Sequence, residues 1–191
     1  MSFIRSILPS FINNNVMYYI GKTQCFIQQF YNNNFLASKI TNRIYVGSLA
    51  DATNIDELKK NGVTHILSVM NGVYELYPND FNYKLIHIND DKWEKIGKHF
   101  NDTTEYIKKT LDENTKNVIL IHCQKGISRS VTILLAYLLF MYNLQEKIEK
   151  NSTECVIIEL LKKIQDNRNI ALPNEGFLNE LKEYIYILNN Y

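Results

Sequence analysis

A cysteine and an arginine stand six positions apart, between a short apolar run and a longer apolar segment without glycine or proline. Residues 118–121 are rich in β-branched side chains and predict a buried strand, and residues 130–142 predict a buried helix. The residues from Cys123 to Arg129 therefore form a strand-to-helix turn, where unpaired backbone N–H groups and the helix dipole favour a bound anion. This pattern predicts a phosphate-binding loop that carries a thiol.

The residue types in this loop suit chemistry at a phosphoryl group. A free thiol has a pKa of ~8.5, and a helix N-terminus beside a guanidinium lowers it by several units, so we expect Cys123 to be largely thiolate at neutral pH. Arg129 offers a planar fork that binds two phosphoryl oxygens, a role that a lysine cannot copy. Gly126 lets the backbone curl so that successive N–H groups point inward as an anion nest.

Two polar neighbours complete the predicted site. Ser130 places a hydroxyl near the sulfur, where it can stabilise the departing thiolate, and His122 is expected to orient the cysteine through its backbone or ring rather than act as a base. A simpler interpretation makes Cys123 a small buried apolar residue and Arg129 a surface charge. We disfavour it because strand, glycine, arginine, hydroxyl and helix follow one another in the order that the site needs.

The loop, His-Cys followed by five residues and Arg-Ser, is similar to the signature of the protein tyrosine phosphatase superfamily, and its wording most resembles the dual-specificity branch. The resemblance covers about residues 42–190. It implies an α/β fold in which a short central mixed β-sheet is flanked by α-helices. Three other segments resemble the opening strand, the next strand, and the last turn and helix of that branch, namely residues 43–47, 62–69 and 172–181.

The same resemblance assigns a general acid. Asp90 and Asp91 follow the alternating strand 83–88, which delivers them to the sheet edge that holds the cysteine loop. Counting back from Ile96 and Phe100, the general acid of the family falls on Asp90; Asp91 and a simple helix-capping role of the cluster are the alternatives. The residues that the family uses to bind the phosphate group match Gln124, Lys125, Gly126, Ile127, Ser128 and Arg129.

The resemblance implies a two-step displacement at phosphorus that uses Cys123, Arg129, Asp90 and Ser130, without a metal or another cofactor. No counterpart of the tyrosine-containing loop of the tyrosine-specific enzymes is visible, so phosphotyrosine, phosphoserine and phosphothreonine in proteins are the expected substrates, and a protein kinase is one candidate partner. Lys125 departs from the small residue usual there and keeps phosphoinositides and RNA 5′-phosphates open as alternatives. A catalytically silent phosphoprotein-binding module and a rhodanese-like sulfur transferase are further alternatives.

Composition agrees with a globular enzyme. The chain has 191 residues, 46% of them hydrophobic, and a formal net charge of +1, so nucleic acid is not an expected partner. The longest apolar stretch, residues 131–142, is too short to span a membrane, which takes about 20 residues. Three cysteines without a close pair favour a reducing compartment, the cytoplasm or also the nucleus. Cys155 lies in a helical pattern and is expected in the core, and no metal-ligand spacing is visible.

The chain divides into an arm, residues 1–40, and a catalytic domain, residues 41–191. The arm contains no acidic residue and is expected to be helical, packing on the domain or mediating homodimerisation; a flexible tail and a targeting peptide are the alternatives. Residues 143–151 lengthen one connection and are expected to extend a solvated helix or to form a partner surface. The remaining predicted helices cover 54–61 and 96–113 and begin near Thr153 and Asn174, and the cysteine strand runs to His122.

Overall fold

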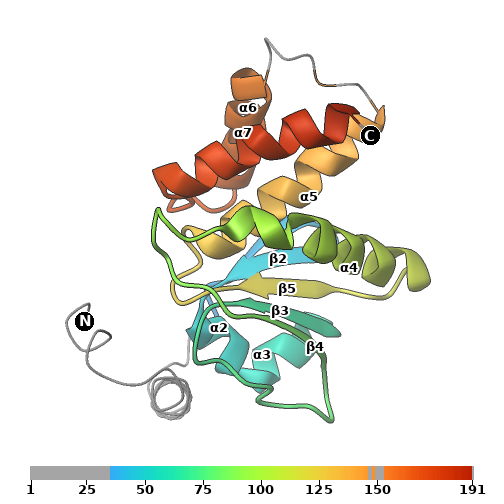
Figure 1. Cartoon of the computed structure of the whole chain (residues 1–191). Coiled ribbons are helices and arrows are strands. Elements are labelled where there is room, and N and C mark those ends of the chain that lie inside the picture. Colours follow the sequence, from blue (N-terminus) through green and yellow to red (C-terminus); the bar gives the residue numbers. More distant parts are fainter. Residues whose placement is uncertain (1–34, 146–147, 149–152, 191) are drawn as a thin grey trace, which may run out of the picture.

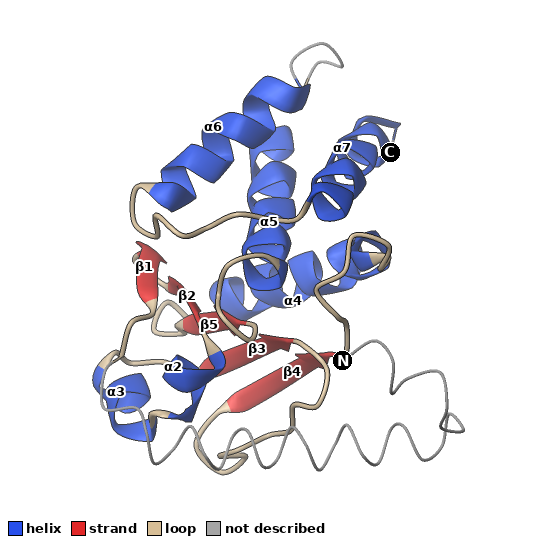
Figure 2. Cartoon of the chain, turned by 90° about the vertical axis from the view of Figure 1, so that its left-hand side faces the viewer, coloured by secondary structure: helices blue, strands red, loops and turns tan. Residues whose placement is uncertain are grey.

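The computed structural model describes residues 35–145, 148 and 153–190. Its centre is a five-stranded sheet with the order β1-β2-β5-β3-β4, in which β1 is antiparallel to β2 and the other neighbours are parallel (Figures 1 and 2). The predicted mixed sheet is therefore confirmed. In the order of the sheet, the strands are β1 Ser38–Thr41, β2 Ile44–Gly47, β5 Ile119–His122, β3 His65–Val69 and β4 Asn82–Ile86.

Helices cover both faces of the sheet (Figure 1). Side chains alternate along a strand, so Ile119 and Ile121 of β5 join the larger core with α4, α5, α6 and α7, while Leu120 joins the smaller core beside α2 and α3. A strand that is buried on both faces has a continuous apolar sequence, and this is why residues 118–121 could be predicted to form a buried strand. The helices are α2 Leu49–Thr53, α3 Ile55–Lys60, the 3₁₀ helix η1 Ile96–His99, α4 Phe100–Glu113, α5 Arg129–Gln145, α6 Thr153–Gln165 and α7 Glu175–Asn190.

The parallel strands end at one edge of the sheet. Gly47 of β2 and Ser68 of β3 both lie opposite His122 of β5, so the segments that follow these three strands start side by side. The segment after β4 leaves from the same edge, because β4 is parallel to β3. Ligand sites of open α/β sheets form at such edges. The topology therefore brings the loop of Cys123 and the segment of Asp90 together, although more than thirty residues of sequence separate them.

Several boundaries differ from the expectations. The predicted helix 96–113 starts as a 3₁₀ turn, and the short helix α2, which begins after the N-cap Ser48, was not anticipated. Strand β1 begins at Ser38, inside the range assigned to the arm. Residues 1–34 of that arm lie outside the described residues, as do residues 146–147 and 149–152 of the long connection, whose first part extends α5 to Gln145.

Cys155 was wrongly predicted to be a core residue. It is exposed on α6, whose buried side chains are Val156, Ile157, Leu160 and Ile164. The helical apolar stripe starts one position after the cysteine, so the cysteine points outside it.

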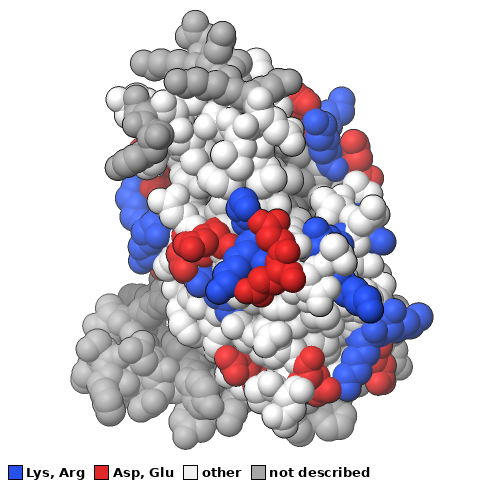
Figure 3. All heavy atoms as spheres, turned by 90° about the vertical axis from the view of Figure 1, so that its right-hand side faces the viewer, with Lys and Arg blue, Asp and Glu red and all other residues white. Residues whose placement is uncertain are grey.

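The charged side chains do not gather by sign on the face to the right in Figure 1, where Lys and Arg lie among Asp and Glu (Figure 3). Helix α4 shows the same mixing at the level of ion pairs, with Lys108 2.5 Å from Asp112 and Lys109 3.7 Å from Glu113. Within the described residues, no helix is both long and apolar enough to serve as a membrane span.

Candidate active site

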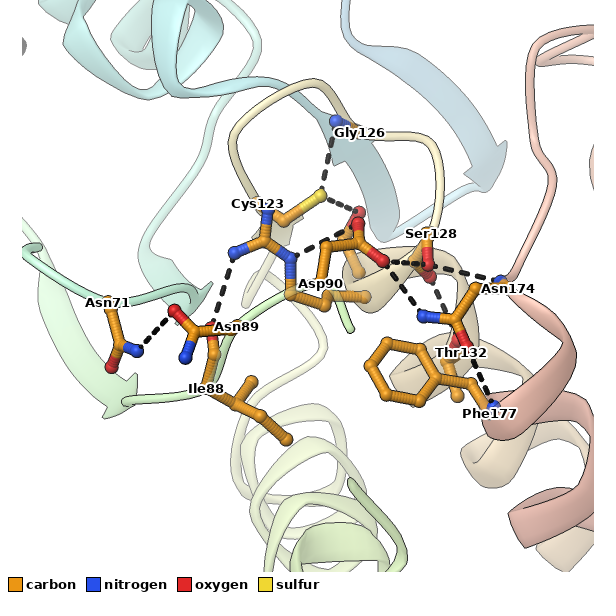
Figure 4. Close-up of polar contacts among 12 residues, drawn as sticks. Asn71, Ile88, Asn89, Asp90, Cys123, Gly126, Ser128, Thr132, Asn174 and Phe177 are labelled. Carbon is orange, nitrogen blue, oxygen red and sulfur yellow. Dashed lines mark hydrogen bonds and ion pairs between the residues drawn. The ribbon is translucent and has the colours of Figure 1, made fainter. Parts of the chain in front are cut away.

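The loop from Gln124 to Ile127 turns its backbone carbonyls outward. The carbonyl oxygen of Gln124 accepts from Leu49 N at 3.3 Å, and that of Ile127 accepts from Leu172 N at 2.9 Å. Because a trans peptide places its N–H opposite its C=O, carbonyls that point outward direct the next N–H groups inward. The carbonyl oxygen of Lys125 also points outward and accepts from Arg168 Nη2 at 3.1 Å, and the N–H of the same peptide, Gly126 N, donates to Cys123 Sγ at 3.2 Å (Figure 4). The curled backbone that the sequence predicted around Gly126 is present, with a φ of +69° at that glycine.

Cys123 is buried, and its sulfur accepts a second hydrogen bond from Ser130 Oγ at 3.3 Å. Burial raises the pKa of the thiol, but the Ser130 hydroxyl, the Arg129 charge and the backbone N–H groups of Ser130 and Lys125 lower it by more. The pKa of Cys123 therefore lies below its ordinary value. A lowered pKa favours the thiolate, which is the nucleophilic form.

Arg129 forms an ion pair with Asp90, and Asp90 in turn lies beside Ser128 and Asn174 (Figure 4). Arg129 Nε stands 3.4 Å from Asp90 Oδ2, and Arg129 Nη1 donates to the carbonyl oxygen of Ile88 at 3.2 Å. Asp90 Oδ1 accepts from Ser128 Oγ at 2.7 Å and from Asn174 Nδ2 at 3.0 Å. Ser128, predicted only as a residue of the phosphate loop, thus also fixes the carboxylate through its hydroxyl.

Asp91 has a different environment. Its Oδ1 accepts from Trp93 N at 2.9 Å, a local turn within its own segment. Of the two neighbouring carboxylates, Asp90 is the one that contacts Arg129 and Ser128.

His122 is buried with its ring between two polar groups. Burial lowers its pKa to about 4, so the ring is neutral at pH 7. Nδ1 lies 3.4 Å from the carbonyl oxygen of Cys123, and Nε2 lies 2.6 Å from Ser68 Oγ. A carbonyl can only accept, so the proton belongs on Nδ1 and Ser68 donates to Nε2. The ring thereby links the backbone carbonyl of Cys123 to the side chain of Ser68 and restricts the orientation of that carbonyl.

Arg168 is a residue that the sequence reasoning missed. Its side chain is buried behind the loop, where Nε donates to the carbonyl oxygen of Gly126 at 2.6 Å and Nη2 to that of Lys125 at 3.1 Å. Nη1 donates to the carbonyl oxygen of Leu36 at 3.1 Å, at the entry to β1. Nothing in the local sequence distinguishes this arginine from a surface charge, because the loop that it binds lies 42 residues away.

The described residues contain no group of three or more His, Cys, Asp or Glu side chains that could hold a metal ion. The chemical groups at this site are a thiol, a guanidinium, a carboxylate, a hydroxyl and inward-pointing backbone N–H groups. Such a set can bind a tetrahedral dianion and supply both a nucleophile and a proton donor.

The family model described as "Dual specificity phosphatase, catalytic domain" matches residues 44–186. This chain belongs to the dual specificity phosphatase family. The match includes every site residue named above except Leu36, and it starts at the first residue of β2.

Individual family members agree with that assignment. The chain is 34% identical over 152 residues to human protein phosphatase Slingshot homolog 3, a match that covers 80% of the chain and 21% of that protein. It is 30% identical over 147 residues to dual specificity protein phosphatase 1B of Arabidopsis thaliana, covering 77% of the chain and 80% of that protein. The chain thus spans 13% to 21% of the length of the Slingshot proteins of fly and human.

Solved structures of the family share the fold. The crystal structure of DUSP15 superimposes with a TM-score of 0.68 at 28% identity, covering 81% of this chain and 92% of that one. The Yvh1 phosphatase domain from Chaetomium thermophilum gives a TM-score of 0.67 at 27% identity, covering 75% and 90%.

Proposed function

We propose that this chain hydrolyses phosphotyrosine and phosphoserine or phosphothreonine in proteins through a phosphocysteine intermediate. The observation that carries the proposal is a buried thiol of lowered pKa that faces inward N–H groups beside Arg129 and Asp90. Membership of the dual specificity phosphatase family supports the same reaction.

The first step forms a bond between Cys123 Sγ and phosphorus while the bond to the leaving oxygen breaks. Asp90 gives that oxygen its proton. Arg129 and the loop N–H groups neutralise charge on the equatorial oxygens, the electrostatic role that metal ions have in kinases. Geometry supports Asp90 rather than Asp91 for this role, because only Asp90 contacts Arg129 and the phosphate loop.

In the second step a water molecule attacks phosphorus and gives its proton to Asp90, the bond between sulfur and phosphorus breaks, and inorganic phosphate leaves. The hydroxyl of Ser130, 3.3 Å from the sulfur, stabilises the thiolate that departs. Cys123 must stay reduced for both steps, which supports a reducing compartment such as the cytoplasm or the nucleus.

Phosphoproteins, with a protein kinase among the candidates, are the proposed substrates because the family acts on proteins. Lys125 is exposed, and its carbonyl oxygen accepts from Arg168 on the other side of the loop. A positive charge at this position would favour highly charged substrates, so phosphoinositides and RNA 5′-phosphates are the second candidate class. Homodimerisation through residues 1–40 stays a prediction from the sequence.

The test is phosphate release, in the presence of EDTA, from an aryl phosphate and from phosphotyrosine, phosphothreonine, phosphoinositide and RNA 5′-triphosphate substrates. Wild-type turnover that is abolished by Cys123→Ser supports the thiolate mechanism, and the panel ranks the substrates. The matched control is Cys155→Ser, which removes an exposed thiol and is expected to leave activity unchanged. A well-folded, reduced wild-type protein without turnover would contradict the enzyme and favour the silent binding module.

A further inference from the structure

The segment that contains Asp90, residues 89–97, packs on the first turns of α7, and we call it the acid loop. At its middle, the backbone of Lys92 lies so close to Gly176 that a β-carbon on this glycine would overlap the Lys92 carbonyl oxygen. At its end, Glu180 Oε1 accepts from Lys95 Nζ at 2.7 Å and Glu180 Oε2 accepts from Gly97 N at 3.0 Å. Both carboxylate oxygens of Glu180 are therefore engaged by the acid loop.

The contact with Gly97 replaces a missing helix cap. The first N–H groups of a helix lack partners within it, and a side chain just before the helix usually supplies one. The 3₁₀ helix η1 begins at Ile96 without a side-chain cap of its own. Glu180, whose side chain is only 12% exposed, accepts from Gly97 N and provides the cap from another helix. A β-carbon on Gly97 would stand 2.5 Å from Glu180 Oε2, so the glycine is what lets the carboxylate approach.

The beginning of the acid loop is tied to the same helix. Asn174 donates through Nδ2 to Asp90 Oδ1 at 3.0 Å, and its Oδ1 caps α7 by accepting from Phe177 N at 3.0 Å (Figure 4). Helix α7 thus holds Asp90 directly at one end of the loop and holds Gly97 through Glu180 at the other.

We propose that Glu180 is a positioning residue for the general acid, because it fixes the acid loop on α7 and so presents Asp90 beside Cys123 before substrate binds. The inference rests on the proposed function, in which Asp90 protonates the leaving oxygen. Proton transfer needs hydrogen-bond reach, and a misplacement of about 1 Å costs on the order of 100-fold in rate. Glu180 touches no reacting atom, so its whole effect must pass through Asp90.

This route of action predicts a dependence on the leaving group. A weakly basic aryl oxide departs without a proton, whereas a strongly basic one needs the acid. Glu180→Ala is expected to lower kcat/KM about 10- to 100-fold for phenyl phosphate, and by less than about threefold for an aryl phosphate of a strongly acidic nitrophenol. Asp90→Asn should show the same selectivity with a larger loss. Glu180→Gln keeps an acceptor for Gly97 N and loses the ion pair with Lys95, so it should recover most of the activity and match Lys95→Met.

The experiment measures kcat/KM over a series of aryl phosphates for these variants, together with the exchange rate of the Gly97 amide, which should rise in Glu180→Ala. Glu154→Gln is the matched control. Glu154 of α6 pairs with Lys182 of α7, the helix that also carries Glu180, so its loss should change neither quantity. Equal losses for all leaving groups, or no loss, would overturn the inference, as would unchanged Gly97 exchange. A wild-type protein without turnover would instead refute the proposed function. The exchange rate of the Gly97 amide would still show, without any turnover, whether Glu180 holds the acid loop on α7.

Discussion

At the scale of single residues, the reactivity of Cys123 is a balance of opposing effects on one thiol. Burial raises its pKa, and four groups lower it: the Ser130 hydroxyl, the Arg129 charge and two backbone N–H groups. Ser130 supplies the largest of the lowering effects through its hydroxyl. The pKa of this thiol therefore depends on the Ser130 side chain, which can be truncated without changing any residue of the loop from Gln124 to Ser128.

Ser130→Ala should raise the pKa of Cys123, since burial remains while the hydrogen bond from Oγ is lost. A hydrogen bond to a charged group contributes about 1.5–3 kcal/mol, so the acid limb of the kcat/KM profile should move up by about 1–2 pH units. Activity then falls most at low pH and recovers as the pH rises. Measured pH–rate profiles check this, and superimposable acid limbs for wild type and variant would show that Ser130 does not set the pKa.

At the scale of elements, the loop that follows Cys123 is held from outside by backbone and side-chain contacts that other elements supply. Arg168, after α6, binds the carbonyls of Lys125 and Gly126, and the same guanidinium binds Leu36 before β1. Asp51 of α2 accepts from Leu36 N at 2.5 Å, so the entry to the sheet and the back of the loop form one connected hydrogen-bond network. The shape of the loop depends on segments from the whole length of the domain.

Arg168→Met should deprive two buried loop carbonyls of their donor and loosen the anion nest. We expect the free energy of unfolding to fall by about 2–3 kcal/mol and the inhibition constant of inorganic phosphate to rise at least about tenfold. Arg43→Met is the control, because Arg43 also binds backbone carbonyls, those of Leu111 and Asn114, but lies at the start of β5, whereas the loop follows the end of that strand. Similar weakening of phosphate binding in both variants would mean that general stability, and not the contact with the loop, is responsible.

At the scale of the whole molecule, stability should depend on pH because histidines are buried in the uncharged form. Burial lowers the pKa of His122 to about 4, and it also lowers the pKa of His65 and His99. In the unfolded chain the pKa of a histidine is about 6.5. Between these values the unfolded state binds protons that the native state does not, so stability falls as the pH is lowered from about 6.5 toward 4.

His122 alone should contribute a loss of about 3 kcal/mol across that window, at about 1.4 kcal/mol per pH unit. Urea unfolding at pH 7.5 and pH 5 samples the upper part of that window, about 1.5 pH units, where the expected loss is about 2 kcal/mol. His122→Gln removes the titrating ring but keeps an acceptor for Ser68 Oγ, so the variant should lose less stability on acidification than the wild type. Identical pH dependence in the two proteins would show that His122 is not the group responsible.

The sequence by itself was sufficient to predict the family and the strand, loop and helix that carry the candidate site. The strand and helix around Cys123 and Arg129 follow from short-range apolar patterning, and the alternating strand before Asp90 delivered it to the right edge of the sheet. These features depend on neighbours within a few residues, so local physics is sufficient to predict them. The misplaced Cys155 shows the limit, because one position on a helix changes which way a side chain points.

The tertiary structure alone decided which distant groups support that chemistry. Arg168, Asn174 and Glu180 reach the loop and the acid segment across 42 to 85 residues of sequence, and each is an ordinary polar residue in its local context. The contacts of Asp90 with Ser128 and Arg129, which distinguish it from Asp91, likewise exist only in the folded chain. Hydrogen bonds that satisfy buried carbonyls and carboxylates are set by how the elements pack, and packing is a property of the folded chain.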